Sequence, residues 1–211
     1  MTIGRLHVIT DVTVQSRYSH EELARMACEG GADVVQLRDK SLSRDAFLAV
    51  ARRVADICRE HRAVLIVNDR VDVARTIDAG GAHVGRTDLG IREARALLGP
   101  HAVVGASTGS LEAALEAERA GADYIGFGHV FATSSKTKPT PPVGLEALGR
   151  VAARVRIPVI AIGGITEANA AEVIAAGAWG IAVIGAVCAA ADPRAVTARL
   201  RATVMAHAGS G

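Results

Sequence analysis

The chain has 211 residues, of which half are hydrophobic and 22% are charged, as in a globular protein with a sizeable core. The net charge is only +2 and aromatic residues make up 3%, so neither a basic stripe nor stacking platforms indicate a nucleic-acid partner. No apolar run reaches the ~18 residues of a membrane span, and we expect no membrane partner.

Short β-branched runs alternate with longer segments of helical periodicity. Apolar strands separated by helices are typical of a parallel sheet buried on both faces, and eight such strands predict an α/β chain with one (β/α)8 TIM barrel over residues 1–211. A doubly wound sheet, the main alternative, would normally use fewer strands. The expected strands are Leu6–Thr10, Val34–Leu37, Val64–Val67, His83–Val84, Val103–Ala106, Tyr124–Phe127, Val159–Ile162 and Gly180–Ile184. The expected helices include Glu21–Cys28, Asp45–Arg59, Arg92–Leu98, Leu111–Arg119, Leu145–Ala153, Ala168–Ala176 and Arg194–Met205.

A short Gly-Ala pattern recurs before every second expected strand, at Gly31, Gly81, Gly121 and Gly177. Glycine adopts the left-handed conformation that ends a helix. We therefore predict that all four glycines end helices, and that the recurrence marks a repeated structural unit.

Cationic side chains follow the second expected strand, in the segment Gln36–Lys40. Alternation along an extended chain places Gln36, Arg38 and Lys40 on one side, toward the mouth of the barrel. Two cations and an amide suit an anionic ligand, although ion pairs at a solvated strand end would give the same pattern.

Acidic residues follow the third and fourth strands, in Asn68-Asp69 and at Asp88. Because adjacent strands end at the same mouth, both carboxylates could reach one Mg²⁺, which binds one or two carboxylates together with substrate phosphates. Alternatively, Asp69 and Asp88 are N-caps of the helices that follow.

Hydroxyl and cationic residues continue this series after the fifth and sixth strands. Ser107 ends the fifth strand, and a long loop after the sixth carries Thr133, Ser135 and Lys136, as in a loop that closes over a ligand. His129 begins that loop, where it could act as an acid or base or could simply be a hydrogen-bonded histidine.

Glycines follow the seventh and eighth strands, at Gly163-Gly164 and at Gly185. Their backbone N–H groups can surround a phosphate, and barrels often bind phosphate at these two loops. The sequence therefore predicts a phosphate-binding barrel with a second anion-binding site near strands two to four. In one interpretation, a metal ion bridges the protein and the ligand at this second site.

These motifs, in this order, resemble thiamine phosphate synthase and its TenI-like relatives, and the resemblance extends from Leu6 to about Ala190. It rests on the following segments and residues: Gln36–Lys40, Asn68-Asp69, Asp88, Ser107-Thr108, Thr133–Lys136, Val143–Leu145 and Ala161–Ile165. The synthase condenses hydroxymethylpyrimidine diphosphate with thiazole phosphate, giving thiamine phosphate and pyrophosphate.

The resemblance implies a role for each matching position. Gln36 would bind the pyrimidine, and Asp69 and Asp88 would bind Mg²⁺. Lys136, Ser107 and His129 are the candidate catalytic residues, with Ser107 near the leaving oxygens. The diphosphate would be held by Arg38, Lys40, Asn68 and Lys136, and the thiazole phosphate and its side of the site by Thr133, Ser135, Gly164, Ile184 and Gly185.

Four positions depart from the synthase pattern, namely Arg86, Gly109, His129 and Gly185. His129 instead resembles the TenI branch, whose members act as metal-independent thiazole tautomerases with a histidine acid/base. A tautomerase would not need Arg38, Lys40 and the two aspartates together, so the synthase is favoured. A non-catalytic precursor-binding barrel and a phosphosugar isomerase are weaker alternatives.

The three cysteines, Cys28, Cys58 and Cys188, lie far apart without metal-ligand spacing. We expect free thiols and a cytoplasmic location. The resemblance is compatible with a homodimer, although the sequence carries no interface signature.

Overall fold

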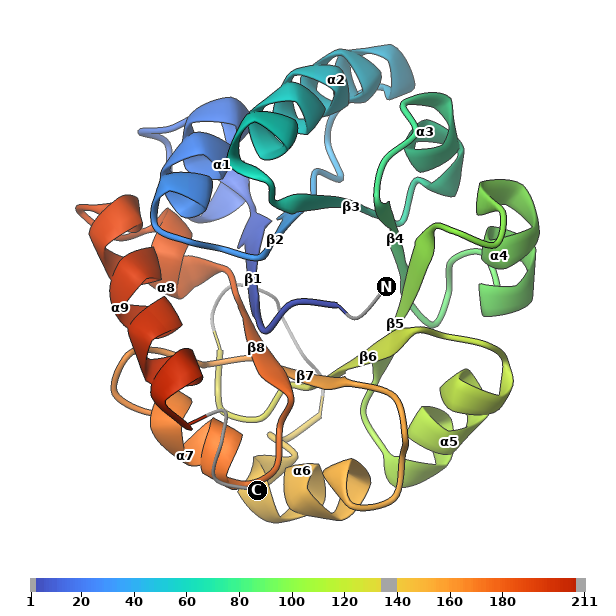
Figure 1. Cartoon of the computed structure of the whole chain (residues 1–211), viewed down its shortest axis with the longest axis vertical. Helices are drawn as coiled ribbons and strands as arrows, with labels where there is room; N and C mark the ends of the chain where they lie inside the picture. The colour runs from blue at the N-terminus through green and yellow to red at the C-terminus, as the bar shows by residue number, and fades with distance from the viewer. Residues whose placement is uncertain (1–2, 134–139, 208–211) are drawn as a thin grey trace.

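The computed structural model describes residues 3–133 and 140–207, and it is a closed barrel (Figure 1). Eight parallel strands pair in chain order and β8 closes onto β1, which confirms the (β/α)8 prediction. The strands are β1 (Leu6–Thr10), β2 (Val34–Leu37), β3 (Val64–Asn68), β4 (Gly81–Val84), β5 (Val103–Thr108), β6 (Tyr124–Gly128), β7 (Val159–Ile162) and β8 (Gly180–Val183).

Helices surround the barrel, one or more after each strand, as Figure 1 shows. The expected helices are confirmed within about two residues, and the chain adds three short ones, η1, α3 and α8, that the periodic pattern did not indicate. The helices are η1 (Val12–Val14), α1 (His20–Glu29), α2 (Arg44–His61), α3 (Val71–Thr76), α4 (Ile91–Leu98), α5 (Leu111–Arg119), α6 (Gly144–Ala152), α7 (Ala170–Ala175), α8 (Gly185–Cys188) and α9 (Pro193–His207).

The apolar core has two layers. The barrel interior is filled by side chains such as Val34, Ile66, Tyr124 and Ile160, and Ile3 packs with them from the N-terminal segment. The larger layer lies between strands and helices, where alternate strand residues such as Val35 meet helix residues. This in-and-out alternation fixes which residues at each strand end face the mouth.

The glycine repeat is confirmed at three of its four positions. Gly31, Gly121 and Gly177 follow α1, α5 and α7 with φ of 88°, 93° and 101°. The prediction is wrong at Gly81, which lies within β4. A Cβ there would lie 1.9 Å from the carbonyl oxygen of Val103, so this glycine allows β4 and β5 to approach closely.

The three cysteines are free and buried, as predicted. Over the described ranges, the chain has no helix with the length and apolar character needed to cross a membrane.

Candidate active site

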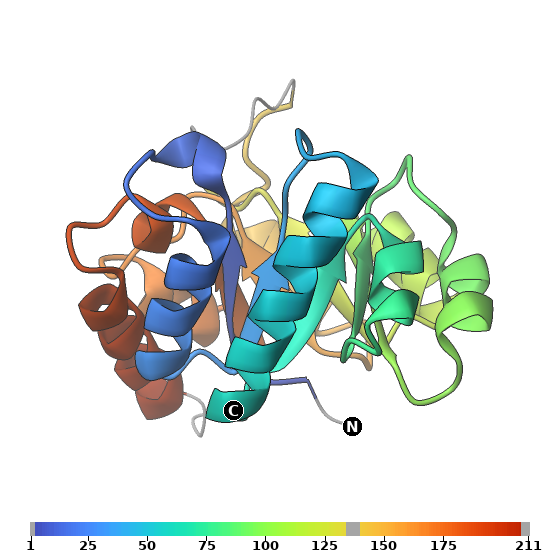
Figure 2. The same cartoon turned by 90° about the horizontal axis from the view of Figure 1, so that it is seen from above.

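The predicted site residues gather at one end of the barrel, where the strands end. In Figure 2 the loops that follow the strands lie at the top, and the segments that lead into the strands lie at the bottom. Loops at this end can bring together side chains from strands that are distant in the sequence.

The two cations after β2 each contact a carboxylate. Arg38 forms a salt bridge with Asp11, which follows β1, and the Lys40 Nζ atom lies 3.2 Å from the Asp69 carboxylate. Gln36 shares the inward face of β2 with Val34, below these cations, and is 3% exposed. The predicted common side of Gln36, Arg38 and Lys40 is therefore consistent with their contacts.

Asp69 and Asp88 are neighbours, and neither caps a helix. The residues before α3 and α4 are Arg70 and Gly90, and no side-chain cap is formed at either helix, so the capping alternative is wrong. The Asp88 carboxylate instead accepts a hydrogen bond from the Gly85 backbone N–H at 2.7 Å. Asp69 has a φ of 63° and its N–H donates to the carbonyl of His83 on β4.

The charge balance around these aspartates suits a divalent cation. Burial and then the hydrogen-bonded carboxyl of Asp88 raise the pKa of Asp69, although Lys40 partly offsets both effects. Two carboxyls in contact repel when both are charged, and a hard cation removes that repulsion. No cluster of three or more acidic, histidine or cysteine side chains suited to a metal occurs within residues 3–133 and 140–207. A cation held here would thus need ligand oxygens or water as well, as is usual for Mg²⁺.

Ser107 lies at the mouth of the barrel, near the end of β5. Its hydroxyl lies 2.9 Å from Nε2 of His83, and Nδ1 of the same ring lies 3.0 Å from the Tyr124 hydroxyl. Asn68 at the end of β3 pairs in register with His83. Ser107 is thus an exposed hydroxyl supported from below by a buried histidine and tyrosine.

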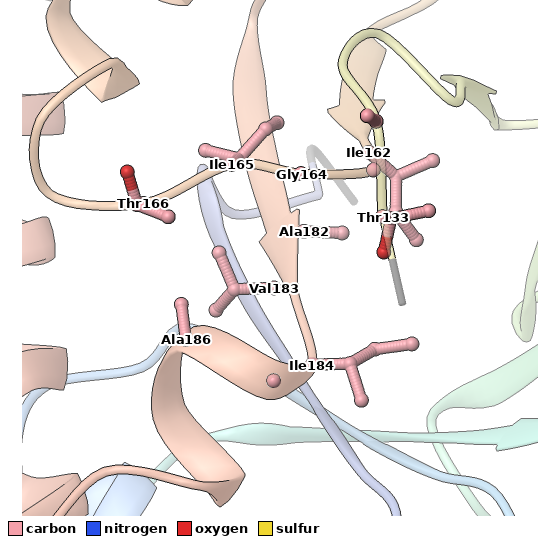
Figure 3. Close-up of a pocket in the computed structure, with 12 residues that line it drawn as sticks. Thr133, Ile162, Gly164, Ile165, Thr166, Ala182, Val183, Ile184 and Ala186 are labelled. Atoms are coloured by element: carbon pink, nitrogen blue, oxygen red, sulfur yellow. The ribbon is translucent and has the colours of Figure 1, made fainter. Parts of the chain in front are cut away.

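A cavity of about 250 Å³ lies at the ends of β7 and β8 (Figure 3). Gly163 and Gly164 form one wall with φ of 100° and 67°, a conformation that strongly favours glycine. Ile184 and Gly185, where α8 begins, form another wall, and Thr133 also lines the cavity. The predicted phosphate-loop residues therefore do share one cavity.

The remaining predicted residues lie in different surroundings, and two of them lie outside the described part of the chain. His129 follows β6 and is 6% exposed, with its Cβ against Gly163. Ser135 and Lys136 lie outside the described residues. Arg86 and Gly109 are exposed at the mouth.

Sequence reasoning gave no role to three buried polar residues beside this site, Asp11, His20 and His83. Asp11 pairs with Arg38, His20 contacts Asp39, and His83 contacts Ser107. The signal for Asp11 was its position directly after β1. His20 opens a helix and His83 lies inside a strand, where histidines are ordinarily structural.

The comparisons with known proteins agree with this geometry. A family profile described as thiamine monophosphate synthase matches residues 6–187. Thiamine-phosphate synthase of Chlorobium phaeobacteroides is 49% identical over 96% of this chain and 97% of its own length. That of Methanoculleus marisnigri is 46% identical over 98% of each chain. The structure of thiamine phosphate pyrophosphorylase from Pyrococcus furiosus covers 97% of each chain with a TM-score of 0.89 and 42% identity. These comparisons give no support to the tautomerase alternative, and the chain belongs to the thiamine monophosphate synthase family.

Proposed function

We propose that this chain condenses hydroxymethylpyrimidine diphosphate with thiazole phosphate to give thiamine phosphate and pyrophosphate. One observation carries the proposal beyond family membership. The mouth has two separate regions suited to anions, one with Arg38 and Lys40 beside β2 and the other a glycine-lined cavity beside β7 and β8. Two phosphorylated substrates need two such regions.

The diphosphate is assigned to the region beside β2 to β4. Arg38, Lys40 and Asn68 would bind its oxygens, and Lys136, outside the described residues, would add a further cation. Asp69 and Asp88 would hold Mg²⁺, which lowers the cost of charge that develops on a leaving pyrophosphate. The contact between these two carboxyls and the raised pKa of Asp69 support this assignment.

The reaction needs charge stabilisation more than an enzyme nucleophile. The bond between the pyrimidine methylene carbon and its ester oxygen breaks, and pyrophosphate leaves with the electron pair. The thiazole nitrogen then supplies the lone pair for the new carbon–nitrogen bond. Arg38 and Lys40 stabilise the departing charge, the Ser107 hydroxyl faces the leaving oxygens, and Gln36 orients the pyrimidine.

The thiazole phosphate is assigned to the cavity in Figure 3. Backbone N–H groups near Gly164 and Gly185 would bind the phosphate, with Ile184 beside them. Thr133, and Ser135 outside the described residues, would lie on the thiazole side. Anchoring the nucleophile in this way converts an encounter between two molecules into a step within one complex.

Product formation from the two substrates, measured with Mg²⁺ and then with EDTA, tests the proposal. Thiamine phosphate and pyrophosphate should appear only with Mg²⁺. Product that persists in EDTA would contradict the metal assignment. A folded protein with no product in either condition would contradict the synthase, and activity on a thiazole carboxylate phosphate that depends on His129 would then identify the tautomerase.

We also propose that the protein works in the cytoplasm, since its three buried thiols are unpaired. A homodimer remains a proposal that light scattering on the purified chain would test.

A further inference from the structure

A buried histidine contacts Asp39, the residue between the two cations of the proposed diphosphate site. His20, the first residue of α1, is 5% exposed. Its Nδ1 atom lies 2.8 Å from the Thr10 hydroxyl at the end of β1, and its Nε2 atom lies 3.0 Å from the Asp39 carboxylate. His20 thus connects the end of one strand to the loop that follows the next.

Asp39 uses its two carboxylate oxygens for different purposes. Oδ1 accepts hydrogen bonds from the Leu42 backbone N–H and from both the N–H and the hydroxyl of Ser41, at 2.7 to 2.9 Å, so it shapes its own loop. Oδ2 accepts only from His20 among the described contacts. Burial alone would raise the pKa of Asp39, but the hydrogen bonds from His20, Leu42 and Ser41 outweigh burial and hold the pKa well below its usual value. Asp39 is therefore a carboxylate at neutral pH, and the His20 Nε2–H donates to it.

The two neighbours of Asp39 in the sequence are the two cations. Asp39 points outward to His20 on α1, whereas Arg38 contacts Asp11 and Lys40 contacts Asp69. This is the alternation of an extended chain continued past the end of β2. Displacing Asp39 would therefore displace the Arg38 and Lys40 backbone together.

We propose that His20 is a positioning residue that anchors Asp39 to the end of β1 and so holds Arg38 and Lys40 toward a bound diphosphate. This inference rests on the proposed diphosphate site. His20 itself does not contact substrate. Its effect should appear in binding of the diphosphate-bearing substrate and leave the thiazole phosphate cavity at the ends of β7 and β8 unchanged.

Two substitutions at this position separate the hydrogen bonds. His20→Gln places an amide nitrogen where Nε2 lies and keeps donation to Asp39. His20→Asn ends near Thr10 and cannot reach Asp39. His7→Gln serves as a matched control, because His7 is also a buried histidine but lies near the start of β1, at the opposite end of the barrel.

The measurements are KM for each substrate and the inhibition constant of inorganic pyrophosphate with Mg²⁺. His20→Asn should raise KM for the diphosphate substrate and the pyrophosphate constant about tenfold, the loss expected for one hydrogen bond to a charged group. KM for thiazole phosphate should not change. His20→Gln should remain near wild type, and His7→Gln should lower the melting temperature without changing either diphosphate value.

Unchanged diphosphate values in a folded His20→Asn variant, with only the melting temperature lowered, would overturn the inference and leave His20 a packing residue. If that variant does not fold, Thr10→Val removes only the distal hydrogen bond and should raise the pyrophosphate constant by a smaller factor. An unchanged constant there would also contradict the proposal. Arg38→Ala and Lys40→Ala test the proposed diphosphate site itself. Unchanged diphosphate values in both variants would overturn that site, and this inference with it.

Discussion

His7 should make the stability of the barrel depend on pH. The side chain is completely buried in β1, and its Nε2 atom lies 3.1 Å from the carbonyl oxygen of Gly4. Its Nδ1 atom has no hydrogen-bond partner among the described residues. The ring is therefore neutral with the proton on Nε2, and a second proton would leave a buried donor unsatisfied.

The size of the effect follows from the pKa. Burial lowers the pKa of His7 from 6.5 to about 4, against smaller opposing contributions from the Gly4 carbonyl and Asp33. The unfolded chain therefore binds a proton near pH 6.5 and the folded chain does not until about pH 4. His7 thus destabilises the fold progressively as pH falls between these values, by about 3 kcal/mol in total.

Urea unfolding of the wild type and of His7→Gln from pH 7.5 to 4.5 measures this contribution. Glutamine does not titrate, so the variant should lose less stability over the range, although it is less stable at pH 7.5. Asp39 titrates only at lower pH, since its folded pKa lies well below the usual value. The remaining titratable groups are the same in both proteins, so their contributions cancel when the two free energies of unfolding are subtracted. A difference between the two proteins that stays constant with pH would refute the assignment of a neutral, desolvated His7.

Three further predictions concern the mouth of the barrel. Asp69→Asn should lower Mg²⁺-dependent kcat/KM by about 10²-fold or more with the melting temperature preserved, because asparagine tolerates the positive φ at this position. Gly164→Ala should raise KM for thiazole phosphate and lower the melting temperature, since its Cβ would lie 2.4 Å from a backbone oxygen, while Gly99→Ala, with open space around it, provides a control for the positive φ alone. His129→Asn should reduce condensation by much less than the ~10²-fold contribution of a general acid or base, and a loss of that size in steady-state kinetics would support a catalytic role of His129 in condensation.

The sequence was most informative where one residue type has one physical consequence. Apolar strands predicted the barrel, and parallel strand ends predicted that Asp69 and Asp88 would meet. Gly81 shows the limit, because the same Gly-Ala letters end a helix at three positions and allow close strand approach at the fourth. Choosing between these uses needs the neighbouring strand, which no local pattern contains.

The short helices and the outward-facing residues were missed. Helix α8 has only four residues, too few for a periodic pattern to stand out. Helix α3 has six residues, as does the predicted helix α7, so length alone does not explain why α3 was missed. Asp39 lies within a motif that the sequence did single out, but its partner His20 is 19 positions away on a helix. The sequence shows that Arg38 and Lys40 share a side, and only the packing of α1 shows what holds the opposite side.

The ion pairs of Arg38 and Lys40 differ in burial, and in the proposed diphosphate site this difference would let Arg38 shape the site and Lys40 respond to the ligand. The Arg38 and Asp11 side chains are 15% and 2% exposed, so their ion pair is poorly screened and costly to break by removing one partner. The Lys40 and Asp69 side chains are 59% and 23% exposed, and an ion pair of this kind contributes about 1 kcal/mol or less. If the diphosphate binds as proposed, Lys40 would leave Asp69 for a phosphate oxygen at little cost and free the carboxylate for the proposed cation, while Arg38 would keep its place. The firmly paired Arg38 and the loosely paired Lys40 thus lie two residues apart, and their ion pairs differ in burial.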